Sequence, residues 1–177
     1  MPVAPYLDTL LLLMVAACAV NDLASRRIPN RLLLAGAAGA LCLHLASAAP
    51  LGGLQSWLGG IATGLIVFLP FYLIRGMAAG DVKMMAAVGA FTGAVDALHI
   101  AIMAWCVGGV MAIAIVAWRG RLLLALSNMW SILRGALLRL PPSPGAYGAT
   151  GQKSAGSMPY GVAIAAGTMI ILISRYG

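Results

Sequence analysis

Residues 81–118, with the sequence DVKMMAAVGAFTGAVDALHIAIMAWCVGGVMAIAIVAW, decide the fold of this chain. Charged side chains are confined to Asp81, Lys83 and Asp96, and the rest of the stretch is largely apolar. The apolar residues do not alternate with polar ones as they do in a membrane barrel, so the pattern favours membrane helices. We expect two spans here, 81–94 and 97–118, joined by a turn.

The composition of the whole chain extends this reading. Of its 177 residues, 62% are hydrophobic and 8% are charged, which is too apolar for a soluble domain of this size. Backbone groups in lipid must be satisfied within the segment, so we expect an all-α, polytopic membrane protein. It forms one domain over 1–177, and the six predicted spans are about 5–22, 30–49, 54–75, 81–94, 97–118 and 158–174.

The segment 119–157 precedes the last span. Residues 121–140 carry a polar stripe, and Arg134 would lie in mid-membrane if they crossed the bilayer. We therefore expect an amphipathic helix on the membrane surface, followed by a loop rich in Gly, Ser, Ala and Pro.

The basic residues predict the orientation. The formal net charge is +7. All Lys and Arg residues except Arg175 are assigned to the same side of the predicted membrane. Because basic residues are enriched on the cytoplasmic side, that side is expected to be the cytoplasm. The N-terminus, the 50–53 loop, the 93–97 turn and the C-terminus face outward. We expect the basic residues to interact with anionic lipid headgroups, and we expect no nucleic acid as a partner. The residues on the cytoplasmic side are Arg26, Arg27, Arg31, Arg75, Lys83, Arg119, Arg121, Arg134, Arg139 and Lys153.

Two aspartates, Asp22 and Asp81, lie on the predicted cytoplasmic side, whereas Asp8 and Asp96 are expected to face outward. The chain has four acidic residues and no glutamate, and a carboxylate at a membrane boundary is a functional candidate because it costs free energy. Span 81–94 is only about 21 Å long against a hydrocarbon core of about 30 Å, so either the bilayer thins or Asp81 lies in a recessed cavity. Two adjacent carboxylates can hydrolyse a peptide bond, one activating water and the other polarising the carbonyl.

Each aspartate also has a simpler explanation. Asp22 could form a helix-end salt bridge with Arg26, and Asp81 could cap the helix that it begins. If the carboxylates form a pair, the helix dipoles favour Asp81, at a helix N-terminus, as the base. Asp22, at a helix C-terminus, would then be the acid.

Three ordered motifs resemble those of one family. Gly76–Lys83 (GMAAGDVK) is similar to a G-x-G-D segment, and Asn21-Asp22 followed by Arg26–Asn30 (RRIPN) looks like a first aspartate motif. Met158–Gly167 (MPYGVAIAAG) looks like a P-Y-G-x-A-I-x-x-G last span. Together they resemble the type IV prepilin peptidases, which are intramembrane aspartic proteases, over essentially the whole chain.

The resemblance implies cleavage of the short basic leader of a prepilin at the cytoplasmic face of the bacterial inner membrane. Asp22 and Asp81 match the two catalytic aspartates, and no metal or cofactor is implied. The expected partners are the prepilin, membrane lipids and other pilus assembly proteins. Ala78 replaces the first glycine of G-x-G-D. The supporting motif residues are Gly80, Ala78, Lys83, Arg26, Arg27, Pro29, Asn30, Pro159, Tyr160 and Gly161.

Larger members of that family carry a cytoplasmic domain with paired C-x-x-C motifs and also N-methylate the new terminus. This chain resembles the short form of tight-adherence (Flp-type) pilus systems, so we expect no methyltransferase activity. Cys18, Cys42 and Cys106 form no C-x-x-C pair and lie in apolar runs.

The roles expected for the other motif residues are simpler. Lys83 is expected to be a lipid-facing anchor, Pro29 and Pro159 to start helices, and Gly161 and Gly167 to allow close helix packing. Two alternatives remain for the chain as a whole, which are a non-catalytic pilus assembly factor with the same fold and a small ion or proton carrier subunit.

Overall fold

The computed structural model describes residues 3–74, 76–118, 120 and 158–176. The predicted surface helix and loop within 119–157 lie almost wholly outside these residues. Contacts divide the chain into two units, Met1–Gly108 with Pro159–Gly177, and Gly109–Met158. The first unit contains both aspartate motifs and residues Pro159–Gly167 of the third motif.

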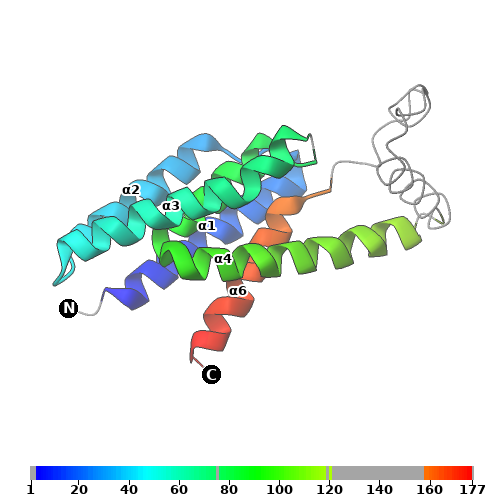
Figure 1. Ribbon diagram of the computed structural model, residues 1–177. Coiled ribbons are helices and arrows are strands. Elements are labelled where there is room, and N and C mark those ends of the chain that lie inside the picture. The colour runs from blue at the N-terminus through cyan, green and yellow to red at the C-terminus, as the bar shows by residue number, and fades with distance from the viewer. Residues whose placement is uncertain (1–2, 75, 119, 121–157, 177) are drawn as a thin grey trace, which may run out of the picture. The chain divides into compact units, whose positions relative to one another are not determined.

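The described residues form helices and no strands (Figure 1). Three of the helices are long and apolar enough to cross a membrane, namely α1, α3 and α4, and the other two are shorter. The all-α prediction is therefore confirmed, and the count of six spans stays a prediction. The helices are α1 (Ala4–Ser25), α2 (Asn30–Leu45), α3 (Pro50–Leu73), α4 (Ala79–Trp118) and α6 (Tyr160–Tyr176).

Helix α4 contains the predicted reversal. Gly93 has φ 79° and ψ 177°, a non-helical conformation that glycine adopts readily. Gly161 binds Asp22 beside Asp81, and its neighbour Tyr160 donates a hydrogen bond to the Ala104 carbonyl. A straight helix would separate residues 81 and 104 by about 35 Å. The chain therefore turns back at Gly93.

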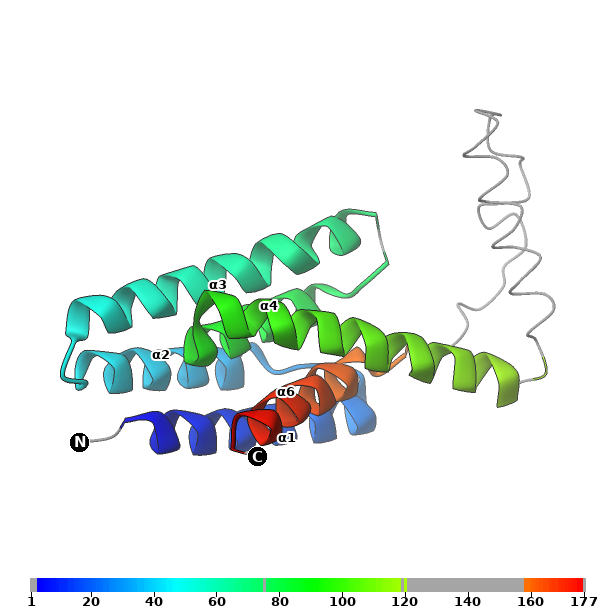
Figure 2. The ribbon, with the colours of Figure 1, turned by 60° about the horizontal axis from the view of Figure 1, so that its bottom comes forward.

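The first part of α4 is the centre of the unit. Its residues from Met84 to Phe91 are all buried, as expected for a helix that is apolar on every side. It packs closely on α3, where a Cβ on Gly60 would overlap the carbonyl oxygen of Gly89. Figure 2 shows α2 and α3 running side by side along this part of the bundle. The core also includes Leu11, Met14, Val15 and Cys18 of α1, Phe68 of α3 and Ile164 of α6.

Two helices begin earlier than the corresponding predicted spans. Residues 50–53, expected as a loop, form the first turn of α3, because Pro50 is favourable at a helix start. Helix α4 begins at Ala79 and not at Asp81, so Gly80 is helical and Asp81 is the third residue of the helix.

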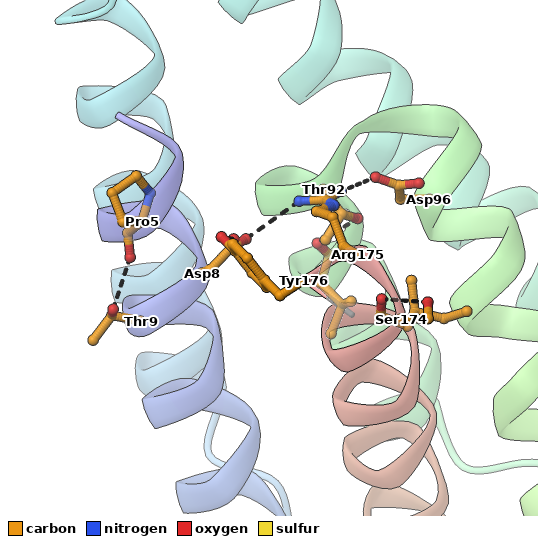
Figure 3. A network of polar contacts seen from close by, with 10 residues as sticks. Pro5, Asp8, Thr9, Thr92, Asp96, Ser174, Arg175 and Tyr176 are labelled. Carbon is orange, nitrogen blue, oxygen red and sulfur yellow. Dashed lines mark hydrogen bonds and ion pairs between the residues drawn. The ribbon is translucent and has the colours of Figure 1, made fainter. Parts of the chain in front are cut away.

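An ion-pair network joins the end of α6 to α1 and α4. It lies at the same end of the unit as residues 93–96. Arg175 donates hydrogen bonds to Asp8 of α1, at 3.4 Å, and to Asp96 of α4, while the Tyr176 hydroxyl donates to Asp8 (Figure 3). Asp8, Asp96 and Arg175 all belong to the side of the chain that was predicted to face outward. In the same cluster, the Nδ1 atom of His99 lies 3.9 Å from Oδ1 of Asp96. The network holds α6 in a fixed register against both neighbouring helices.

Candidate functional site

The candidate site is a cleft of about 300 Å³ at the opposite end of the same unit. It forms where α1 ends and where α2 and α4 begin, so segments far apart in the sequence meet there. Asp22 and Asp81, the two predicted catalytic residues, both line the cleft and are both 7% exposed. The other lining residues are Arg26, Arg27, Ile28, Asn30, Ala78 and Gly80.

Asp81 is held by the start of its own helix. Its Oδ2 accepts a hydrogen bond from the backbone N–H of Ala78, at 3.3 Å. An acidic residue at the third helical position that reaches back to the N-cap residue forms one half of a capping box. Asp81 therefore does cap its helix, as the simpler explanation stated, but it does so from the third helical position. The cap does not remove Asp81 from the cleft but fixes its orientation there.

Asp22 is held by a different helix. It lies within α1, one turn before the end, and its Oδ2 accepts a hydrogen bond from the backbone N–H of Gly161 at 2.9 Å. Gly161 is the second residue of α6, where backbone N–H groups have no partner within the helix. The salt bridge to Arg26 suggested as an alternative is not among the ion pairs formed by the described residues.

This contact alters the expected roles of the two carboxylates. The sequence placed Asp81 at a helix N-terminus and Asp22 at a helix C-terminus. In the structure, both carboxylates accept a hydrogen bond at a helix N-terminus, that of α4 for Asp81 and that of α6 for Asp22. The partial positive charge of a helix start therefore acts on both, and it no longer distinguishes the base from the acid.

A comparison with protein families now bears on this arrangement. Residues 9–113 match the model of the type IV leader peptidase family. The chain belongs to this family. The predicted family is thereby confirmed, and with its apolar helices the chain is a membrane protein of a protease family. Comparisons with curated proteins and with solved structures gave no significant match.

The matched range of the leader peptidase family contains every residue that lines the cleft. It ends before α6, although α6 supplies the N–H group that binds Asp22. A Cβ on Gly161 would lie 2.9 Å from the Asp22 Oδ2 atom, closer than such contacts occur. The sequence singled out Gly161 as a packing residue. Its contact is more specific, because a glycine leaves room for the carboxylate that its own N–H binds.

Ala78 departs from the G-x-G-D pattern without backbone strain. Among the described residues, only Arg26, Gly93 and Gly120 have a positive φ. Ala78 therefore needs no left-handed conformation, and alanine is compatible with the position. Its N–H still serves as the donor to Asp81.

Arg26 adopts an unusual conformation that the sequence did not reveal. It ends α1 with φ 54° and ψ 30°, and its N–H donates to the Asp22 carbonyl at 3.0 Å. A left-handed conformation costs a residue other than glycine about 1–2 kcal/mol. The turn directs the chain from α1 along the cleft, so that Arg26 and Arg27 line it on the way to Pro29, the N-cap of α2.

Two further motif residues make contacts beyond the expected ones. Lys83, expected to be only a lipid-facing anchor, donates a hydrogen bond to Asn30 Oδ1 at 3.3 Å and so joins α4 to the start of α2. Tyr160 follows Pro159 at the start of α6, and its hydroxyl donates to the Ala104 carbonyl. Its ring packs edge-on against Phe68, with ring centroids 6.1 Å apart. Gly167 packs against the α4 backbone, as predicted, since a Cβ there would lie 2.9 Å from the Ala104 nitrogen.

Proposed function

We propose that this protein is a prepilin leader peptidase, an intramembrane aspartic endopeptidase in which Asp22 and Asp81 are the catalytic pair. One observation carries the proposal. Two buried carboxylates from separate helices line one small cleft, and each is oriented by a backbone N–H group of a helix start. Membership of the leader peptidase family supplies the reaction class.

The cleft can support the following chemistry. One carboxylate, ionised, takes a proton from a water molecule as its oxygen attacks the scissile carbonyl carbon. The other, protonated, gives its proton to the carbonyl oxygen. The tetrahedral intermediate then collapses as the C–N bond breaks. The leaving amine takes a proton from the first carboxyl group, and one hydroxyl group of the intermediate returns its proton to the second carboxylate, so both carboxyl groups regain their starting states. Oriented carboxylates suit this sequence because acid, base and water must be in place together.

The proposed substrate is a type IV prepilin of the Flp type with a short basic leader, cut at the cytoplasmic face of the inner membrane. The motifs, the positive side of the chain and the absence of paired C-x-x-C motifs in the sequence support this form. In the proposed topology six helices cross the membrane, with α4 contributing two, and both termini lie outside. N-methylation is not part of the proposed activity.

Cleavage by the isolated protein tests the proposal. The protein is purified in detergent, returned to lipid vesicles and incubated with a full-length prepilin, and the products are identified by mass spectrometry. We expect two fragments that meet at the end of the basic leader. A non-catalytic assembly factor or an ion carrier would leave the prepilin intact, and an intact prepilin would therefore reject the proposed function.

A further inference from the structure

A second cavity adjoins the candidate site. It is an apolar groove of about 370 Å³ formed by α2, α3 and the first part of α4. Asn30 lines both the groove and the cleft. Among the described residues, Asn30 and Lys83 are the only polar ones that line the groove, and they are hydrogen-bonded to each other. The apolar lining residues are Leu33, Leu34, Ala37, Ile61, Leu65, Ala86 and Ala87.

The position of this groove distinguishes it from a larger one. The groove between α1 and α6 measures about 750 Å³, but it includes Asp8 and Tyr176 of the ion-pair network and shares no residue with the cleft. A polypeptide whose backbone occupies the cleft can reach the smaller groove directly. The smaller groove is therefore the better candidate for binding a substrate, because it is continuous with the cleft, although the other groove is larger.

The walls of the smaller groove suit a helix. Helices in a membrane associate through small residues that let their backbones approach closely. Three of the lining residues are alanines, Ala37, Ala86 and Ala87, whereas the described part of the chain contributes one alanine, Ala16, to the larger groove. A volume of about 370 Å³ admits the side chains along one face of a helix, which is how amphipathic and apolar helices bind grooves.

We propose that this groove binds the apolar helical segment that follows the scissile bond of the substrate. This inference rests on the proposed function. The peptide bond to be cut lies in the cleft, the chain passes Asn30 and Lys83, and one face of the following helix packs on α2, α3 and α4. Asn30 and Lys83 offer hydrogen bonds to the polar backbone at the point where the chain leaves the cleft.

Cysteine cross-linking tests the groove directly, with a matched control. Leu34 lines the smaller groove and is 70% exposed, while Leu13 lines the larger one and is 64% exposed. Each is changed in turn, Leu34→Cys and Leu13→Cys, in a protein that lacks the native cysteines and carries Asp81→Asn, so that the substrate stays uncut. Leu34 lies about 6 Å along α2 from Asn30, so the prepilin carries one cysteine one to two turns beyond the scissile bond.

We expect a mixed disulfide with the prepilin from Leu34→Cys and little or none from Leu13→Cys. Equal yields from the two variants would overturn the proposal. A disulfide that forms only between two enzyme copies would overturn the proposal in favour of self-association. If neither variant formed a disulfide, the proposal would also be overturned, with lipid as the occupant of the groove. The experiment needs no cleavage, so its outcome is separate from that of the vesicle assay for the proposed function.

Kinetics give a second test with an active enzyme. Ala37→Phe narrows the smaller groove, and Ala16→Phe makes the same change in the larger one. We expect Ala37→Phe to raise KM for the prepilin about tenfold with kcat little changed, the scale of one ill-fitting group in an apolar pocket. Ala16→Phe should leave KM unchanged. Equal KM values for the two variants would contradict the proposed docking.

Discussion

Replacing Gly161 by alanine tests the link between α6 and the proposed catalytic pair, Asp22 and Asp81. The Gly161 N–H donates to Asp22 Oδ2 at 2.9 Å, and a Cβ on residue 161 would lie 2.9 Å from the same oxygen and 3.2 Å from the Asp22 Cβ. Ordinary contacts of a Cβ begin at 3.4 Å. The carboxylate or the start of α6 must therefore move by about 0.5 Å, which is the tolerance within which catalytic groups have to be held.

The expected size of the effect follows from the hydrogen bond. A hydrogen bond to a charged group contributes about 1.5–3 kcal/mol. Each 1.4 kcal/mol or so lost from the stabilisation of the transition state lowers the rate about tenfold. If the shift of Asp22 breaks the bond, kcat for prepilin cleavage should fall by about 10- to 100-fold. KM should change little, because Asp22 acts on the reacting atoms and not on the body of the substrate.

The control variant is Gly167→Ala, in the same helix. The three atoms nearest to a Cβ there would all be backbone atoms of α4, with the Ala104 nitrogen at 2.9 Å, and none of them belongs to a residue that lines the cleft. It should lower thermal stability at least as much as Gly161→Ala, while cleavage per folded molecule stays close to normal. Both variants are assayed in vesicles, with the folded fraction measured by size-exclusion chromatography. If Gly161→Ala loses no more activity than Gly167→Ala, the positioning of Asp22 by α6 is refuted.

Three other changes test separate features. Ala78→Gly, which restores the G-x-G-D pattern, should change the cleavage rate less than about threefold, because Ala78 is unstrained and its N–H is kept; a large gain would show that alanine impairs the site. Gly93→Ala should destabilise the protein by about 1–3 kcal/mol, since φ is positive there and a Cβ would lie 2.6 Å from the Ser56 hydroxyl oxygen, and an unchanged melting temperature would argue against the turn in α4. Chelators should leave cleavage intact, and so should replacement of all three cysteines by alanine; activity that is lost on chelation and restored by zinc would contradict an aspartic mechanism.

The charge pattern of the sequence predicted which acidic residues share a side of the membrane. The asymmetry of basic residues assigned Asp22 and Asp81 to one side and Asp8, Asp96 and Arg175 to the other, and the structure gathers each group at its own end of the unit. Charge patterns are informative here because few charged residues are present and each has a strong positional preference.

The sequence could not reveal the contacts that hold these groups. The donors to the two aspartates are backbone N–H groups, which every residue except proline carries, so no side-chain pattern marks them. The left-handed turn at Arg26 was hidden for a related reason, because arginine gives no signal for a positive φ. The hydrogen bond from Lys83 to Asn30 joins α2 to α4, and only the packing of those helices brings the two residues together.

The central claim is that Asp22 and Asp81 cleave the prepilin together, and paired Asn substitutions test it most directly. Asp22→Asn and Asp81→Asn keep the size of the side chain and can still accept the Gly161 and Ala78 hydrogen bonds, but they cannot exchange a proton. Asp96→Asn, at the opposite end, makes the same chemical change away from the cleft. With membrane levels matched by immunoblot, we predict that each of the first two variants stops processing of a co-expressed prepilin and that Asp96→Asn does not. Normal processing by either Asp22→Asn or Asp81→Asn would contradict the account.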